Sequence, residues 1–100
     1  MNISMTDFLA KQATKQLNII DLRSNYLYRN GNIKNSINIP YNYLLLTPEK
    51  YLSKEETYYL YCEYGSTSKF ISKKLNSYGY HTISIDTGYT GYTGYKSSSN

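Results

Sequence analysis

Apolar and polar positions follow two different periods along this chain, and together they predict strands and helices in alternation. Four short, β-branched or largely apolar runs have the length and composition of buried strands. Between them lie segments with apolar residues three and four positions apart, or with a capping residue before an apolar stretch, as in helices. The strands are predicted over residues 17–22, 36–39, 57–62 and 82–85, and the helices over 5–15, 26–28, 41–46 and 67–78.

Local signals support these boundaries. Ser4 precedes Asp7 by three residues, which is the pattern of a capped helix start. Ser24 stands in the capping position of the short second helix, and Pro40 precedes the third. Gly79 follows the fourth helix, where a residue that accepts a positive φ commonly ends one.

A short repeat lies near the C-terminal end of the chain. The triplet Thr-Gly-Tyr occurs three times from Thr87, and a polar stretch from Lys96 follows. Three triplets are too few for a solenoid. We therefore expect an irregular loop or a single helical turn, then a flexible tail over 96–100, and one domain over 1–95. Strands that alternate with helices predict an α/β fold with a mainly parallel sheet, and its site should lie at the carboxyl ends of the strands.

Composition limits the class of protein. The chain has 100 residues, of which 40% are hydrophobic and 18% charged, so a single folded domain is expected rather than disorder. No apolar run is long enough to span a membrane, and the first residues lack the blocks of a secretory signal. These features predict a cytoplasmic protein that does not bind membranes.

Charge and residue counts exclude several kinds of site. The net charge is +4, but the basic residues are scattered, with no cluster larger than the doublet Lys73-Lys74, which argues against nucleic-acid binding. Cys62 is the only cysteine and His81 the only histidine. Disulfides, redox cysteine pairs and thiol-rich or multi-histidine metal sites are therefore excluded, and we expect His81 at the surface or the core edge.

Cys62 has the sequence position of a reactive group. It ends the most strongly predicted strand and starts a short loop with Gly65, just before a helix. Amides of such a loop point at the sulfur, and the helix dipole favours a thiolate, so the segment is a potential anion cradle. The residues alone leave two interpretations open, a nucleophile or a buried structural cysteine.

Four segments in register, 18–23, 31–40, 61–69 and 86–92, carry short motifs that together cover most of the chain. They are Asn-Ile-Ile-Asp-Leu-Arg, Gly-Asn-Ile-Lys-Asn-Ser-Ile-Asn-Ile-Pro, Tyr-Cys-Glu-Tyr-Gly-Ser-Thr-Ser-Lys and Asp-Thr-Gly-Tyr-Thr-Gly-Tyr. In this order they resemble a single-domain rhodanese. The resemblance implies a rhodanese-like α/β fold, with a parallel sheet of about five strands flanked by helices.

The resemblance also implies a cofactor-free and metal-free sulfurtransferase, in which Cys62 takes sulfane sulfur from a small anionic donor, thiosulfate or a persulfide, and passes it to a thiol acceptor. Asp21 would brace the loop by accepting hydrogen bonds, and Arg23 would form a structural ion pair. The amides of the loop would hold the persulfide and the donor, and the loop residues are Glu63, Tyr64, Gly65, Ser66, Thr67 and Ser68.

Several residues depart from the family pattern. The loop has no cation, and Glu63 instead places a negative charge beside the nucleophile, which would repel an anionic donor unless its side chain points into solvent. Lys69 could steer the donor or could be a solvated helix residue. The hydroxyls of residues 66–68 could replace cationic donors. Asn32 stands in place of the family's histidine and Tyr92 in place of its closing tryptophan, and both changes are interpreted as structural.

Other functions fit less well. Phosphatases with a similar loop require an arginine where this chain has Ser68, because a guanidinium must hold the phosphoryl group. The absence of this arginine also argues against arsenate reduction. The alternative that stays open is a non-catalytic binding or regulatory module on a rhodanese scaffold, which Glu63 would favour and Cys62 would not. We expect a monomer.

Overall fold

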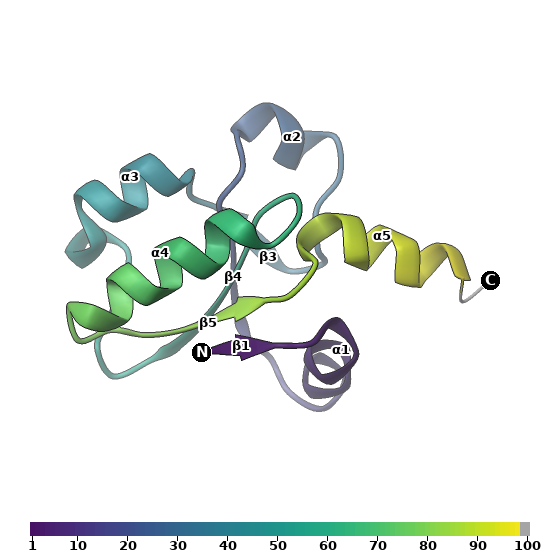
Figure 1. Cartoon of the computed structure of the whole chain (residues 1–100), viewed down its shortest axis with the longest axis horizontal. Helices are drawn as coiled ribbons and strands as arrows, with labels where there is room; N and C mark the ends of the chain where they lie inside the picture. Colours follow the sequence, from purple (N-terminus) through teal and green to yellow (C-terminus); the bar gives the residue numbers. More distant parts are fainter. Residues whose placement is uncertain (99–100) are drawn as a thin grey trace.

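Residues 1–98 are described by the computed structural model, whose centre is a five-stranded sheet with every neighbouring pair parallel (Figure 1). The strand order is β1-β5-β4-β2-β3, so β4 lies in the middle. The strands are β1 (Asn2–Ile3), β2 (Asn18–Asp21), β3 (Ser36–Asn38), β4 (Thr57–Tyr61) and β5 (His81–Ile85). This architecture confirms the predicted α/β class with a parallel sheet.

Helices cover both faces of the sheet. The α-helices are α1 (Met5–Thr14), α2 (Asn25–Arg29), α3 (Tyr41–Leu46), α4 (Ser66–Ser77) and α5 (Gly88–Ser98), and a 3₁₀ turn η1 (Pro48–Lys50) follows α3. α3 packs beside α4, and α1 contacts α5 (Figure 1). The predicted caps are present, because Ser4 accepts a hydrogen bond from the Asp7 N–H and Ser24 accepts one from the Leu27 N–H.

Two apolar clusters, one on each face, hold the layers together. Successive residues of a strand face opposite sides, so Leu60 of β4 joins one cluster while its neighbours Tyr59 and Tyr61 join the other. The first cluster packs under α3 and α4 and contains Ile20, Leu22, Ile39, Leu44, Leu52, Leu60, Ile71, Leu75 and Tyr80. The second packs under α1 and α5 and contains Met5, Phe8, Ile19, Ile33, Tyr59, Tyr61, Ile85 and Tyr92.

Register brings the ends of β2 and β4 together, which fixes the position of the site. Asp21 lies opposite Tyr61 in the ladder, and the Leu22 N–H donates to the Tyr61 carbonyl at 2.9 Å. The chain leaves both strands at the same edge of the sheet, so the segments that carry Arg23 and Cys62 start next to each other. This is the carboxyl edge of a parallel sheet, where the sequence placed the site.

The main correction concerns the Thr-Gly-Tyr repeat, which is neither an irregular loop nor a single turn. It forms most of α5, which runs from Gly88 to Ser98. Residues 96–98 therefore belong to a helix and not to the expected tail, while 99–100 lie outside the described residues. Tertiary packing overrides the low helix propensity of glycine here, because Tyr92 is buried against the sheet.

Two smaller differences follow from local sequence. β1 was not predicted, because two residues are too few to show an alternating pattern. In α4 the buried residues are Ser68, Ile71, Ser72 and Leu75, whereas Phe70 and Tyr78, which fit the apolar spacing, are exposed. Small serines allow α4 to lie close to β5, since Ser72 hydrogen-bonds Thr82 at 2.7 Å.

Candidate active site

Cys62 follows β4 directly, and its side chain lies within the turn of its own loop. The thiol sulfur accepts hydrogen bonds from the backbone N–H of Gly65 at 3.1 Å and of Ser68 at 3.3 Å. The residue is 6% exposed. The loop of residues 62–68, called the Cys62 loop below, thus surrounds the sulfur with amide donors at the start of α4, a geometry that favours negative charge on sulfur.

Further amides of the Cys62 loop are open to a ligand. Within residues 1–98, the backbone N–H groups of Glu63, Tyr64, Ser66 and Thr67 have no protein acceptor. Two of them belong to the first turn of α4, where the helix leaves its N–H groups unpaired. Together with the two donors to sulfur, they make a set of backbone donors on one loop, of the kind that binds anions.

Gly65 makes the sharp turn of this loop possible. Its φ is +109°, in the region that side chains disfavour. A Cβ at this position would also lie 3.0 Å from the Thr87 backbone nitrogen. The glycine is therefore required both for backbone conformation and for the close approach of the segment that precedes α5.

The N-terminus of α5 anchors the loop from the opposite side. The Tyr89 N–H donates to the Cys62 carbonyl at 2.9 Å, and the Thr90 N–H donates to the Glu63 carbonyl at 3.0 Å. Gly88, with φ of +56°, allows this contact, because a Cβ there would collide with the Cys62 carbonyl oxygen. α5 thus holds two carbonyls of the loop, while two of the loop's N–H groups, those of Gly65 and Ser68, point at the sulfur.

A buried ionic network ties Glu63 to the end of β2. Arg23 donates from Nη2 to Asp21 Oδ2 at 2.7 Å and from Nη1 to Glu63 Oε1 at 3.0 Å. It also donates to the Gly31 carbonyl at 2.7 Å. The Asp21 side chain is fully buried, whereas that of Glu63 is 37% exposed. Glu63 therefore points at a guanidinium and not into open solvent.

Tyr61 and Tyr89 complete the surroundings of Arg23. The Tyr61 hydroxyl donates to Asp21 Oδ2 at 2.7 Å, and the Arg23 guanidinium lies 4.2 Å from the centre of the Tyr89 ring. Burial raises the pKa of Tyr61 above its ordinary value. Burial alone would lower the pKa of Arg23, but the hydrogen bonds to Asp21 and Glu63 outweigh it and raise that pKa, so the guanidinium stays charged.

Comparison with known proteins identifies the family of this chain. The family model described as rhodanese-like domain matches residues 4–95. The chain belongs to the rhodanese-like domain family. A search of the curated proteins found no match.

Solved structures agree with this family. A protein from Staphylococcus saprophyticus is 26% identical, with a TM-score of 0.80 and 87% of each chain covered. A rhodanese-like domain protein from Staphylococcus aureus is also 26% identical, with a TM-score of 0.76 over 88% of this chain and 87% of the other. A rhodanese-related protein from Thermoplasma volcanium, at 24% identity, has the same fold, with a TM-score of 0.81 over 93% and 90% of the two chains.

The residues predicted for the rhodanese site fall into two groups in the structure. Asp21, Arg23, Cys62 and the loop amides come together at the carboxyl edge of the sheet. The hydroxyl of Ser68 does not, because it is fully buried and hydrogen-bonds Ser84 at 2.7 Å. The backbone amide of Ser68 faces the sulfur and its hydroxyl does not, so the expectation that this hydroxyl replaces a cationic donor is wrong.

The remaining predicted positions lie around the loop. Ser66 and Lys69 are exposed, Thr67 is half-buried, and Tyr64 is 72% exposed at the tip. Asn32, in place of the family's histidine, donates from its side chain to the Tyr28 carbonyl at 2.9 Å. These contacts are compatible with a local structural role for Asn32.

Sequence reasoning missed two contributors to the site. The pairing of Glu63 with Arg23 joins residues 40 positions apart, and only the neighbouring ends of β2 and β4 bring them together. The second is the N-terminus of α5, which was missed because the Thr-Gly-Tyr repeat was expected to form an irregular loop or a single turn. The signal that could have found it is the change from β-branched strand to Asp86-Thr87-Gly88, a strand end followed by a glycine turn.

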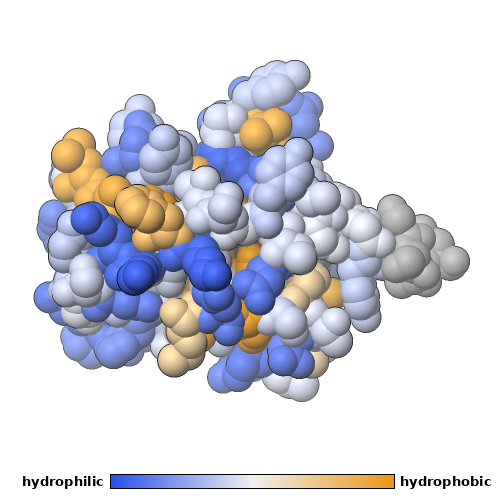
Figure 2. All heavy atoms as spheres, in the orientation of Figure 1, coloured by the Kyte–Doolittle hydropathy of each residue, from blue (hydrophilic) through white to orange (hydrophobic). Residues whose placement is uncertain are grey.

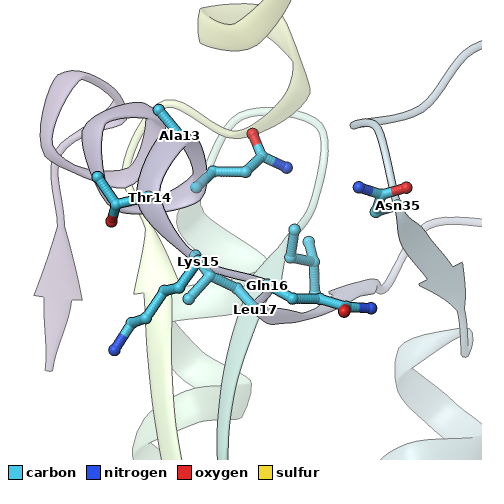
Figure 3. Close-up of a pocket in the computed structure, with 8 residues that line it drawn as sticks. Ala13, Thr14, Lys15, Gln16, Leu17 and Asn35 are labelled. Carbon is cyan, nitrogen blue, oxygen red and sulfur yellow. The ribbon is translucent and has the colours of Figure 1, made fainter.

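One cavity of about 500 Å³ borders the surroundings of Arg23, since Gly31 and Tyr89 line it, and another lies away from this chemistry. The latter, of about 390 Å³, is formed by the end of α1, the start of β2 and Asn35, at the amino ends of the strands (Figure 3). Cys62 is at the opposite end of the sheet. Among residues 1–98, no three His, Cys, Asp or Glu side chains gather as metal ligands would, and none of the helices is long and apolar enough to cross a membrane.

Proposed function

We propose that this chain is a sulfurtransferase in which the Cys62 thiolate accepts sulfane sulfur and carries it as a persulfide. The observation that supports this most directly is the pair of amide donors, from Gly65 and Ser68, on the thiol sulfur. They place positive electrostatic potential where the nucleophile needs it and where the charged persulfide will sit.

With thiosulfate, we expect the reaction to proceed in two steps. The Cys62 thiolate attacks the outer sulfur, an S–S bond forms to Cys62, and the S–S bond of thiosulfate breaks with its electron pair leaving on sulfite. The outer sulfur of the Cys62 persulfide is then attacked by cyanide to give thiocyanate, or by a thiolate to give a new persulfide, and the Cys62 thiolate is regenerated. A persulfide donor supplies sulfur in the same way, with a thiol as leaving group.

The loop amides are the groups available to stabilise both anions. Those of Glu63, Tyr64, Ser66 and Thr67 have no acceptor within the described chain, so a donor can occupy them without breaking a protein hydrogen bond. Lys69, exposed in the first turn of α4, is the nearest cation in sequence and would steer an anionic donor. The proposal places the protein in the cytoplasm as a monomer, where a single free thiol stays reduced.

Intact-mass measurement tests the proposal. Reduced protein is incubated with thiosulfate and then with cyanide, with Cys62→Ser as the matched variant. We expect the wild type to gain the mass of one sulfur atom and to lose it again with cyanide, while the variant does neither. If folded wild type gains no sulfur from thiosulfate or from a small persulfide, the proposal fails and the non-catalytic binding module takes its place.

A further inference from the structure

An exposed surface beside the Cys62 loop combines apolar side chains with unneutralised positive charge. It is formed by the outer sides of α3 and α4, and we call it the α3–α4 face. Its residues are Tyr43, Leu46, Lys69, Phe70, Lys73 and Lys74. Figure 2 shows hydrophobic residues gathered over α3 and along its border with α4, with hydrophilic residues of α4 next to them.

Apolar exposure is high on this face. Leu46 is 78% exposed and Phe70 61% exposed, although each belongs to a helix that buries other residues in the core. One exposed apolar side chain is ordinary, but several together on one face are typical of an interaction surface. Phe70 lies two residues after Ser68, whose amide contacts the sulfur, so the surface begins where the active-site loop ends.

The charged side chains of α3 and α4 are all positive. α4 contains three lysines and no acidic residue, and α3 contains no charged residue. Lys73 and Lys74 follow Phe70 at three and four positions, so they flank it on the helix surface. None of the three lysines forms an ion pair in the part of the chain that the structure describes.

These features decide between the two simplest occupants. A second copy of this chain, related by a two-fold axis, would bring the three lysines against themselves, and like charges disfavour such a contact. A partner with carboxylates around an apolar centre would instead match both the charges and the exposed Phe70. Because the face adjoins Cys62, a protein seated there could hold its own reactive sulfur at the loop.

We propose that the α3–α4 face docks a protein with an acidic contact surface that bears a cysteine persulfide, the sulfur donor to Cys62. This rests on the proposed function. The transfer step balances, because the Cys62 thiolate takes the outer sulfur of the partner's persulfide and the partner's cysteine leaves as a thiolate. Lys73, Lys74 and Phe70 bind the partner in this proposal and do not touch the reacting atoms.

The test compares two synthetic peptide persulfides of equal length, each with one cysteine, one leucine and one phenylalanine. One carries four glutamates and the other four lysines. Second-order rates of sulfur transfer to Cys62 are measured by mass spectrometry, with glutathione persulfide as the small donor. We expect the acidic peptide to react about tenfold faster than the basic one at low salt, with little difference at 0.5 M salt, since salt screens surface charges.

Variants locate the effect. Lys73→Glu with Lys74→Glu should remove the preference for the acidic peptide and leave the rate with glutathione persulfide unchanged. Lys11→Glu with Lys15→Glu, which changes the net charge equally on the other side of the sheet, should keep the preference. Phe70→Ser should slow the acidic peptide, whereas Ile37→Ser, at an equally exposed position on edge strand β3, should not.

Each failure has its own meaning. If glutathione persulfide transfers sulfur but the two peptides react equally, or the basic one reacts faster, the docking proposal is wrong and the proposed function stands. If no donor transfers sulfur, the proposed function fails, and binding of an acidic peptide with serine in place of cysteine then tests the surface alone. Concentration-dependent dimerisation that Phe70→Ser abolishes would assign the face to a second copy and overturn the proposal.

Discussion

Replacing Arg23 by methionine should destabilise the protein strongly, because the guanidinium holds the buried Asp21 carboxylate. Methionine keeps the apolar stem and approximate length of the side chain, so the change removes mainly the charge and its hydrogen bonds. Arg23 donates to Asp21 from Nε at 3.0 and 3.1 Å and from Nη2 at 2.7 Å. Among the described residues, the hydrogen-bond donors that remain to the Asp21 carboxylate are then the Tyr61 hydroxyl and the backbone N–H of residue 23.

The expected magnitude follows from this burial. Removing one partner of a buried ion pair costs about 3–5 kcal/mol, because the other charge is left uncompensated. Loss of the contact with the half-exposed Glu63 adds less than about 1 kcal/mol. In a domain of this size, 1 kcal/mol corresponds to about 4–8 °C in the midpoint of thermal unfolding, so we expect a fall of roughly 12–40 °C.

Thermal and urea unfolding followed by circular dichroism measure this effect. Arg29→Met is the matched control, since Arg29 is exposed at the end of α2, and its effect should stay within about 0.5 kcal/mol. Adding Asp21→Asn to Arg23→Met removes the uncompensated charge and should restore at least about 1 kcal/mol. A loss below about 1 kcal/mol for Arg23→Met alone would refute the view that this arginine neutralises Asp21.

Two further predictions concern Tyr61 and the glycines of the repeat. Burial raises the pKa of Tyr61 in the folded state, so the contribution of this group to stability is present below pH 10 and is lost as pH rises above it. In urea unfolding above pH 10, the free energy of unfolding of the wild type should therefore fall by about 1.4 kcal/mol per pH unit more than that of Tyr61→Phe. A decrease equally steep in Tyr61→Phe would assign it to other groups. Gly88→Ala should destabilise the protein by about 1–3 kcal/mol and slow persulfide formation at Cys62, since a Cβ there meets the Cys62 carbonyl. Gly94→Ala, with open space around it, should instead stabilise α5 by about 0.5–1 kcal/mol. Equal effects of the two alanine variants would contradict the contact between α5 and the loop.

The sequence predicted the parts of this fold that depend on local pattern. The strand that ends at Tyr61 and the helix after it have strong periodicity and clear boundaries, and their order alone places Cys62 at the carboxyl edge of the sheet. The capping interactions of Ser4 and Ser24 were equally predictable from the sequence, because they join residues three positions apart. Local signals of this kind need no tertiary information.

What the sequence could not predict depends on contacts between distant segments. The three triplets look identical, yet Gly88 touches the Cys62 loop and a Cβ on Gly91 would collide with Thr87. A Cβ on Gly94 would meet no other part of the described chain within 4 Å. Their difference arises only from where each falls along α5. The orientation of Glu63 likewise depends on Arg23, which reaches it through the pairing of β2 with β4.

The acidic residue after the nucleophile is therefore less unfavourable than its position in the sequence indicates. Asp21, Arg23 and Glu63 carry formal charges of −1, +1 and −1, so the network as a whole has one excess negative charge, shared between a buried and a half-exposed carboxylate.

Arg23 holds the Glu63 carboxylate, while the backbone N–H groups of the loop surround the sulfur. The groups that contact the sulfur are therefore amides, whereas the neighbouring guanidinium of Arg23 is occupied by Asp21 and Glu63. The exposed cations that directly follow the loop in sequence lie on α4. Amide donors select weakly for the total charge of a ligand, whereas a lysine-bearing surface selects for an acidic one. Under the proposed function, chemistry at Cys62 and choice of donor would thus be carried by different parts of the same strand–loop–helix unit.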